Sequence, residues 1–155
     1  VFAMADSFDP TVRSRIMASI HSQNTKPEVL LRKALFARGL RYTLHPKDLM
    51  GHPDIVLPKW GAIIFVHGCF WHGHNCGHVR LPRSNSHFWK KKISRNLERD
   101  KQTEESLRKD GWRICNVWDC ALKNKYPQDI NNVADKVVEW IYFGGKKKTF
   151  LSRRK

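Results

Sequence analysis

Apolar residues recur at helical spacing in four segments of the chain, which we expect to form helices. The segment "DPTVRSRIMASI" opens with Asp9 as a helix N-cap and Pro10 in the first helical position. The segment "TKPEVLLRKALFARG" carries the capping-box pair Thr25 and Glu28 and ends at Gly39. The same spacing predicts two later helices, at about residues 85–109 and 129–142.

Four short apolar runs predict strands instead, at residues 41–44, 54–57, 62–66 and 112–118. The turn "PKWG" is short enough to join the second and third strands as an antiparallel hairpin. The long helix between the third and fourth strands implies a parallel crossover. The element order indicates an α/β domain with a mixed sheet flanked by helices. We expect one domain over residues 1–155, a basic tail from residue 144, and residues 1–3 to be foreign to the natural chain.

Positive charge is the strongest global feature, because 29 Lys and Arg residues face 14 Asp and Glu residues, a net charge of +15. An excess of this size favours a polyanionic partner, most often nucleic acid, over a merely well-solvated surface. The tail "KKKTFLSRRK" carries only part of it. No segment is long and apolar enough to cross a membrane and none resembles a signal peptide, so we expect a cytoplasmic, nucleoid-associated protein with no membrane contact.

The segment "HGCFWHGHNCGH" at residues 67–78 concentrates histidine and cysteine in a stretch too polar for a core. Zn²⁺ takes four nitrogen or sulfur ligands in a tetrahedron, and this spacing is typical of a structural zinc site. A fourth ligand is expected from Cys115 or Cys120. Apolar neighbours indicate that Cys115 is a core residue, whereas Cys120 follows the strand and can reach a nearby loop. The predicted ligands are Cys69, His74, Cys76 and Cys120.

A second pattern, "HPDIVL", puts Asp54 at the start of a strand that leads through a hairpin to Val66 and His67. This is the arrangement of the restriction-endonuclease-like PD-(D/E)xK core, in which two carboxylates hold Mg²⁺ and a lysine helps to activate water. Here the second carboxylate is missing, so a backbone carbonyl would have to replace it, and His67 takes the lysine position. Pro-Asp is also common at turns, so the pattern alone is weak.

Two aromatic pairs, Phe70-Trp71 and Phe88-Trp89, stand beside polar or basic residues, and the second pair is followed by three lysines that end at Lys92. Aromatic side chains can insert between base steps while neighbouring cations hold phosphates. Core packing is the alternative, and we expect it for Trp60, Trp112, Trp118 and Trp140.

The sequence "NLERD" places Asn96, Arg99 and Asp100 on one face of the predicted long helix. Asp100 could orient a histidine there, as carboxylates often do. A ladder of surface salt bridges is the alternative.

In this order and spacing, "GHPDIVL", "FVHGCFWHGHNC", "FWKKKISRNLERD" and "GWRICNVWDCAL" resemble the very-short-patch repair (Vsr) endonucleases, from about Met4 to Ile141. The resemblance implies a variant restriction-endonuclease-like core with a structural zinc. It also implies a Mg²⁺-dependent enzyme that nicks one strand of duplex DNA on the 5′ side of the thymine in a T:G mismatch. Such an enzyme would act as a monomer on its DNA, with mismatch-repair proteins as candidate partners.

The resemblance further implies roles for individual residues. Asp54 would bind Mg²⁺ together with the main-chain carbonyl of Val66. His72 would be the general base, supported by His67 and Glu28, and Asp100 would orient a catalytic histidine. The zinc ligands would be the four named above, and the residues on DNA would be Met17, Phe70, Trp71, Trp89, Lys92 and Asn96.

The chain departs from the family pattern at Val66, where members carry Thr, at Gly73, which replaces a histidine, and in loop 45–52, which bears on the flanking-sequence preference. Two other functions are compatible with the same residues. One is a zinc-stabilised DNA-binding protein without catalysis, and the other is a restriction-type endonuclease that cuts both strands at matched sites.

Overall fold

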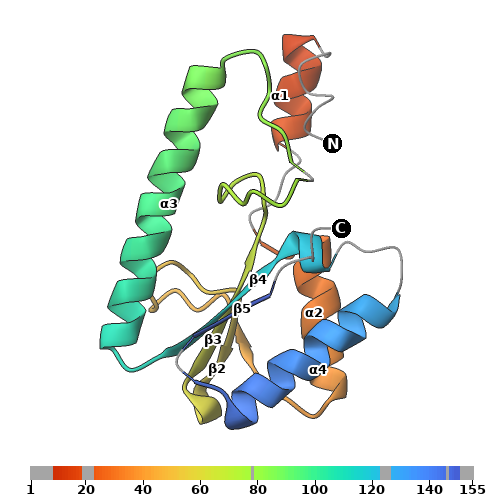
Figure 1. Ribbon diagram of the computed structural model, residues 1–155, viewed down its shortest axis with the longest axis vertical. Helices are drawn as coiled ribbons and strands as arrows, with labels where there is room; N and C mark the ends of the chain where they lie inside the picture. The colour runs from red at the N-terminus through yellow and green to blue at the C-terminus, as the bar shows by residue number, and fades with distance from the viewer. Residues whose placement is uncertain (1–8, 19–22, 78, 123–126, 146, 151–155) are drawn as a thin grey trace.

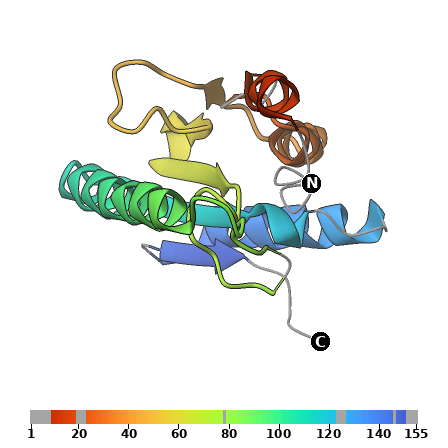
Figure 2. The ribbon, with the colours of Figure 1, turned by 90° about the horizontal axis from the view of Figure 1, so that it is seen from above.

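A computed structural model describes residues 9–18, 23–77, 79–122, 127–145 and 147–150 (Figure 1). A five-stranded mixed sheet has helices on both faces (Figures 1 and 2). The helices are α1 (Pro10–Ala18), α2 (Lys26–Ala37), α3 (Ser86–Lys109) and α4 (Pro127–Phe143), with short 3-10 helices η2 (Pro58–Trp60) and η3 (Asp119–Ala121). The strands are β1 (Thr43–Leu44), β2 (Ile55–Leu57), β3 (Ala62–His67), β4 (Arg113–Trp118) and β5 (Lys147–Phe150).

The strands lie in the order β1-β2-β3-β4-β5. The expected hairpin is confirmed, since β2 and β3 are antiparallel with Val56 opposite Ile63. Its turn ends at Gly61, whose φ of 56° lies in the left-handed region that glycine adopts without strain. The expected crossover is also confirmed, because β3 and β4 are parallel with Ile64 opposite Cys115.

Two apolar layers hold the helices to the sheet. On one face Leu31 and Leu35 of α2 pack with Val137 and Ile141 of α4 against buried side chains of β2, β3 and β4. On the other face Leu107 of α3 packs with a smaller buried set, Val56, Ile63, Phe65 and Ile114. Figure 2, which looks along the sheet, shows α3 on the opposite side from α2 and α4. The layers leave the carboxyl ends of β3 and β4 open to the loops that carry the polar residues.

Local signals in the sequence explain where helix α2 begins and ends. Thr25 is the N-cap, and its Oγ1 accepts a hydrogen bond from the Glu28 amide at 3.5 Å. Gly39 follows the helix with a φ of 85°, a left-handed conformation that favours glycine. The cap fixes the first turn of α2, and therefore the position of Glu28, at the edge of the sheet.

The sequence predictions differ from the structure mainly at the two ends of the sheet. Residues 147–150 form β5, parallel to β4, where the sequence predicts a basic tail and no strand. Strand pairing uses backbone groups, so a basic segment can supply it. The first strand is only Thr43–Leu44. Ser19, Ile20 and His78, together with residues 1–3 and 151–155, lie outside the described residues. Within the described residues, no helix is both long and apolar enough to cross a membrane.

Candidate active site

Most of the predicted catalytic and DNA-contacting residues line a cavity of about 1020 Å³ at the open end of the sheet. The start of β2, the end of β3, the loop that follows β3 and the middle of α3 all reach it. Met17 of α1 lines the same cavity from the side of the N-terminal helix. The lining includes Asp54, Val66, His67, Trp71, His72 and Asp100.

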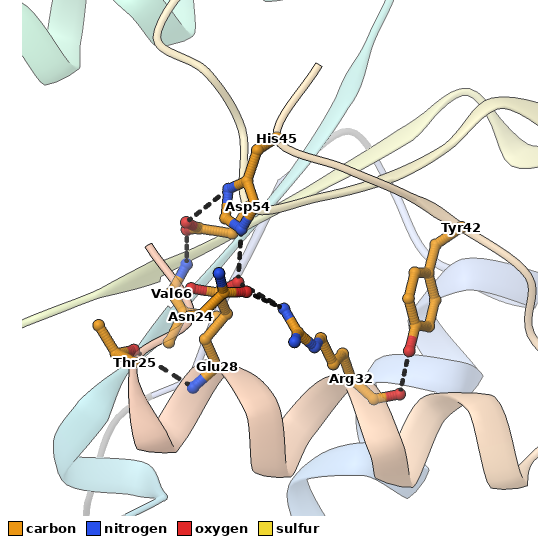
Figure 3. A network of polar contacts seen from close by, with 8 residues as sticks. All are labelled: Asn24, Thr25, Glu28, Arg32, Tyr42, His45, Asp54 and Val66. Atoms are coloured by element: carbon orange, nitrogen blue, oxygen red, sulfur yellow. Dashed lines mark hydrogen bonds and ion pairs between the residues drawn. The ribbon is translucent and has the colours of Figure 1, made fainter. Parts of the chain in front are cut away.

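Asp54, which lines the cavity, forms a close acidic pair with Glu28, which is buried behind the lining (Figure 3). Glu28 comes from the first turn of α2, and its side chain is only 1% exposed. Its Oε1 lies 3.2 Å from Nη1 of Arg32 and 2.8 Å from Nε2 of His45. The carboxylate is thus buried next to two nitrogen-bearing side chains.

Asp54 lies immediately before β2 and reaches across to β3, where its Oδ2 accepts a hydrogen bond from the Val66 amide at 2.7 Å. Burial raises the pKa of Asp54 from 3.8 to about 7, the Val66 hydrogen bond opposes that rise, and the neighbouring Glu28 adds to it. The two carboxylates have oxygens within 4.8 Å of each other. Two negative charges so close repel each other, and a divalent cation would remove the repulsion. The donor set therefore fits an oxygen-preferring cation, with the Val66 peptide alongside.

A second polar group, His67, His72 and Asp100, crosses from β3 to α3. The rings of His67 and His72 lie 4.3 Å apart between centroids, and Nδ1 of His72 contacts Oδ2 of Asp100. Nε2 of His67 lies 3.2 Å from Oδ1 of Asn116 in β4. Burial, reinforced by His72, lowers the pKa of His67 to about 4. His67 is therefore uncharged near neutral pH.

The four predicted zinc ligands, Cys69, His74, Cys76 and Cys120, form one cluster, with their ligand atoms all within 4.8 Å of one another. Nδ1 of His74 lies 3.2 Å from Sγ of Cys69 and 3.7 Å from Sγ of Cys120. All three cysteines are buried, and burial raises the pKa of the Cys69 thiol. A buried thiolate therefore needs a cation beside it, so the residues present fit a zinc ion. Cys115 lies in the core, as expected.

The cysteine cluster also fixes the loop after β3. The Cys69 amide donates to Oδ1 of Asp119 at 3.3 Å, and the ring of His74 stacks on Trp118 at 4.3 Å. Gly73, with a φ of 63°, presses against α3, where a Cβ would lie 2.9 Å from Cγ2 of Ile93. This close approach to α3 accounts for glycine at a position where the family pattern has histidine.

Three aromatic residues predicted to contact DNA form one cluster between this loop, which carries two of them, and α3, which carries the third. Phe70, Trp71 and Trp89 are in mutual edge contact, with ring centroids 5.0 to 6.0 Å apart. Phe70 is only 3% exposed and is the buried member of the cluster, in contact with the other two rings. Nζ of Lys92 lies 5.3 Å from the Trp71 ring centroid and 5.7 Å from that of Trp89. Asn96 donates from Nδ2 to the Trp71 carbonyl at 2.9 Å, which ties α3 to the loop.

Two residues of the site were missed in the sequence. Asn116 is a polar residue in the otherwise apolar buried strand "RICNVW", and that contrast was the available signal. His45 is a lone histidine after a two-residue strand, and no motif marks it. Its position between Glu28 and Asp54 is visible only in three dimensions (Figure 3).

Comparisons with known proteins agree with this geometry. Residues 5–78 match the family model described as DNA mismatch endonuclease Vsr. Over 138 residues the chain is 36% identical to the DNA mismatch endonuclease Vsr of Escherichia coli, covering 89% of this chain and 88% of that protein. It is 50% identical over 122 residues to the type II nicking enzyme V.NmeAIP of Neisseria meningitidis, covering 79% and 87%. It is 45% identical over 121 residues to the type II nicking enzyme V.XorIIP of Xanthomonas oryzae, covering 78% and 89%.

The Glu28–Asp54 pair, the group His67, His72 and Asp100, and these relatives together define an endonuclease that acts on DNA, a hydrolase of phosphodiester bonds. The chain belongs to the Vsr family of DNA mismatch endonucleases.

Proposed function

We propose that this protein is a Mg²⁺-dependent endonuclease that nicks one strand of duplex DNA on the 5′ side of the thymine in a T:G mismatch. The observation that carries the proposal is that one cavity is lined both by Asp54, the acid paired with Glu28, and by the group His67, His72 and Asp100, beside the aromatic cluster. Hydrolysis of one strand at a distorted base pair requires acidic ligands for a metal ion, a general base that activates water, and a contact to the stacked nucleobases.

The cation would be held by Asp54, with Glu28 and the Val66 carbonyl in support, because Mg²⁺ prefers oxygen ligands. When bound, it supplies a positive charge that stabilises the charge developing on the phosphate. Asp54 keeps one oxygen on the Val66 amide, which fixes the direction of its carboxylate. This arrangement of Asp54, β2 and β3 supports the restriction-endonuclease-like core that we infer for the sheet.

His72 is suited to the role of general base. Its Nδ1 faces Asp100, so the tautomer that donates to the carboxylate leaves Nε2 to accept a proton from water. The neighbouring imidazole of His67 is uncharged at neutral pH, and it therefore does not repel the protonated form of His72. Asp100 stabilises the imidazolium that forms when the water loses its proton.

Trp71 and Trp89 are suited to enter the base stack, with Phe70 as their support. A T:G wobble is stacked less well than a matched pair, so opening it costs less free energy, and that difference supplies selectivity. Lys92 brings a positive charge to the rim of the same cluster, where a phosphate would pass. Met17, on α1, would approach the DNA from the other side of the cavity.

Zn²⁺ would be structural and would hold the loop after β3 at a set distance from β4. The loop carries Trp71 and His72 between the ligands Cys69 and His74. One ion would therefore position both the general base, His72, and the ring of Trp71 that enters the base stack. We further infer that the enzyme acts as a monomer on its DNA, with mismatch-repair proteins as candidate partners.

The test is a nicking assay on end-labelled duplexes that carry a T:G mismatch or the matched pair at the same position. Wild-type protein with Mg²⁺ should nick only the thymine strand of the mismatched duplex, and Asp54→Ala should bind that duplex without nicking it. Equal cleavage of both duplexes on both strands would favour a restriction-type enzyme. Binding by wild type without any nicking would favour a zinc-stabilised DNA-binding protein.

A further inference from the structure

His45 lies between the two carboxylates of the acidic pair (Figure 3). Its Nε2 is 2.8 Å from Oε1 of Glu28 and its Nδ1 is 3.9 Å from Oδ1 of Asp54. The side chain is 12% exposed, and the backbone has a φ of 46°, in the left-handed region. The imidazole is therefore held in the space where the two acids face each other.

Neither carboxylate depends on His45 for its position. Glu28 is fixed by the Thr25 cap on its amide and by Arg32, whose Nη1 donates to its Oε1. Asp54 is fixed by the Val66 amide. If His45 served only to orient the two acids, it would duplicate these contacts. Its position between them instead favours a ligand, such as a cation, that all three side chains bind.

The three side chains have the spacing of a cation site. One oxygen each of Glu28 and Asp54 and one imidazole nitrogen of His45 lie within 4.8 Å of one another. Ligands about 2.0 to 2.3 Å from one ion are separated by roughly 3 to 4.5 Å, so small side-chain movements bring all three onto it. An imidazole nitrogen suits transition-metal ions such as Mn²⁺ better than it suits Mg²⁺.

We propose that His45 is a nitrogen ligand of the cation held by Asp54 and Glu28, and that it shifts the preference of this site from Mg²⁺ toward Mn²⁺. The proposal rests on the proposed function, in that the acidic pair is taken as the cation site. It adds a residue that sets which cation occupies the site. An enzyme with an oxygen ligand at this position would favour Mg²⁺ more strongly.

The experiment is electron paramagnetic resonance of Mn²⁺ bound to the DNA-free, zinc-loaded protein, with Mg²⁺ affinity measured by competition. Electron spin-echo modulation detects the hyperfine coupling of a directly bound nitrogen. His45→Asn is the variant, because Asn tolerates positive φ and has no ring nitrogen. His52→Asn is the matched control, since His52 has the same φ of 46°, is exposed, and precedes Asp54 by two residues.

Wild type and His52→Asn should show the nitrogen coupling, and His45→Asn should lose it. His45→Asn should also bind Mn²⁺ about 10- to 100-fold more weakly, with a smaller change for Mg²⁺. Zinc content and thermal melting verify the fold, and His45→Gln serves as a second variant if Asn unfolds the loop.

A coupling that persists in both His45 variants would overturn the proposal, because the nitrogen would then come from another residue, such as His67 or His72. A coupling that is absent from wild type with Mn²⁺ bound would overturn it as well. That result leaves the proposed nuclease intact if Asp54→Ala still abolishes Mn²⁺ binding. Mn²⁺ binding that is unchanged in Asp54→Ala would instead remove the cation site itself, and with it both proposals.

Discussion

The imidazole of His72 contacts the carboxylate of Asp100, Nδ1 to Oδ2, and joins the loop after β3 to the middle of α3. A carboxylate on one imidazole nitrogen directs the other nitrogen toward the cavity. We expect His72→Ala to lower the single-turnover nicking rate on a T:G duplex by about 10²- to 10⁴-fold, the usual contribution of a general base. Asp100→Asn should lower it less, because the amide oxygen still accepts the hydrogen bond but no longer stabilises the imidazolium.

Glu98→Gln is the matched control for Asp100→Asn. Glu98 is an exposed carboxylate on the same helix, and it hydrogen-bonds only to Gln102 among the described contacts. Its nicking rate should equal that of wild type. If Asp100→Asn nicks as fast as Glu98→Gln while His72→Ala is inactive, Asp100 has no orienting role.

The buried carboxyl of Asp54 should make the cation-free protein less stable as pH rises. Its pKa is 3.8 ordinarily and about 7 in the fold, so between those values the folded protein holds a proton that the unfolded chain has released. The free energy of unfolding therefore falls as pH increases through that window. Asp54→Asn removes this pH-dependent decrease in the free energy of unfolding. The variant should be more stable than wild type by about 1–3 kcal/mol near pH 8.

Urea unfolding of Mg²⁺-free protein, at a series of pH values from about 5.5 to 8, measures this difference. The advantage of Asp54→Asn should grow with pH, although the variant cannot nick DNA. A variant that is less stable than wild type at the alkaline end would mean that the carboxylate is stabilised by its neighbours. Arg32, whose Nη1 lies 3.2 Å from Oε1 of Glu28, would then be the responsible cation.

Much of this site could be predicted because its parts are local in sequence. The capping pair Thr25 and Glu28 and the terminator Gly39 define α2 without tertiary information. The choice of Cys120 over Cys115 follows from the strand pattern, because a cysteine within the apolar run must point into a layer of the core. Periodicity and short-range geometry therefore account for most elements and for the cluster of three cysteines and His74.

The remaining features depend on contacts that no local pattern encodes. β5 pairs through backbone groups and carries basic side chains, so hydrophobicity gives no sign of it. His45 becomes part of the site only because the fold brings the residue after β1 against Glu28 of α2, 17 positions earlier in the sequence. Phe70 has the same aromatic character as Trp71, and only the packing distinguishes the buried support from the half-exposed ring.

The cysteine cluster makes a prediction about stability. As a zinc ligand, Cys120 would tie the loop after β3 to the end of β4, so Cys120→Ser should lower the free energy of unfolding by at least about 3 kcal/mol and lose most of the bound zinc. Elemental analysis and thermal melting measure the two effects. Cys115→Ala is the control and should retain about one zinc per chain, because Cys115 lies in the core. Equal zinc loss in both variants would contradict the assigned ligand set.

Lys92 should contribute to the affinity for DNA independently of the base sequence. Its Nζ stands over the Trp71 and Trp89 rings at the rim of the cavity, where a phosphate can approach. Lys92→Ala should weaken binding to matched and T:G duplexes by a similar factor and reduce the salt dependence of log Kd by about one phosphate contact. Binding titrations at several salt concentrations test this. A loss confined to the T:G duplex would instead assign Lys92 to mismatch recognition.

Trp71 should behave in the opposite way. A ring that enters the base stack adds binding affinity only where the stack can be opened, as at a mismatch. Trp71→Ala should weaken binding to the T:G duplex about 10- to 100-fold and leave the weaker binding to matched duplex nearly unchanged, since that depends on phosphate contacts. Phe143→Ala is the control, an aromatic residue that is 87% exposed at the end of α4. Fluorescence anisotropy with both duplexes gives the ratio of affinities, and thermal melting checks that the variant remains folded. A Trp71→Ala variant that keeps the wild-type ratio would show that the aromatic cluster is a structural support and that the mismatch is recognised elsewhere.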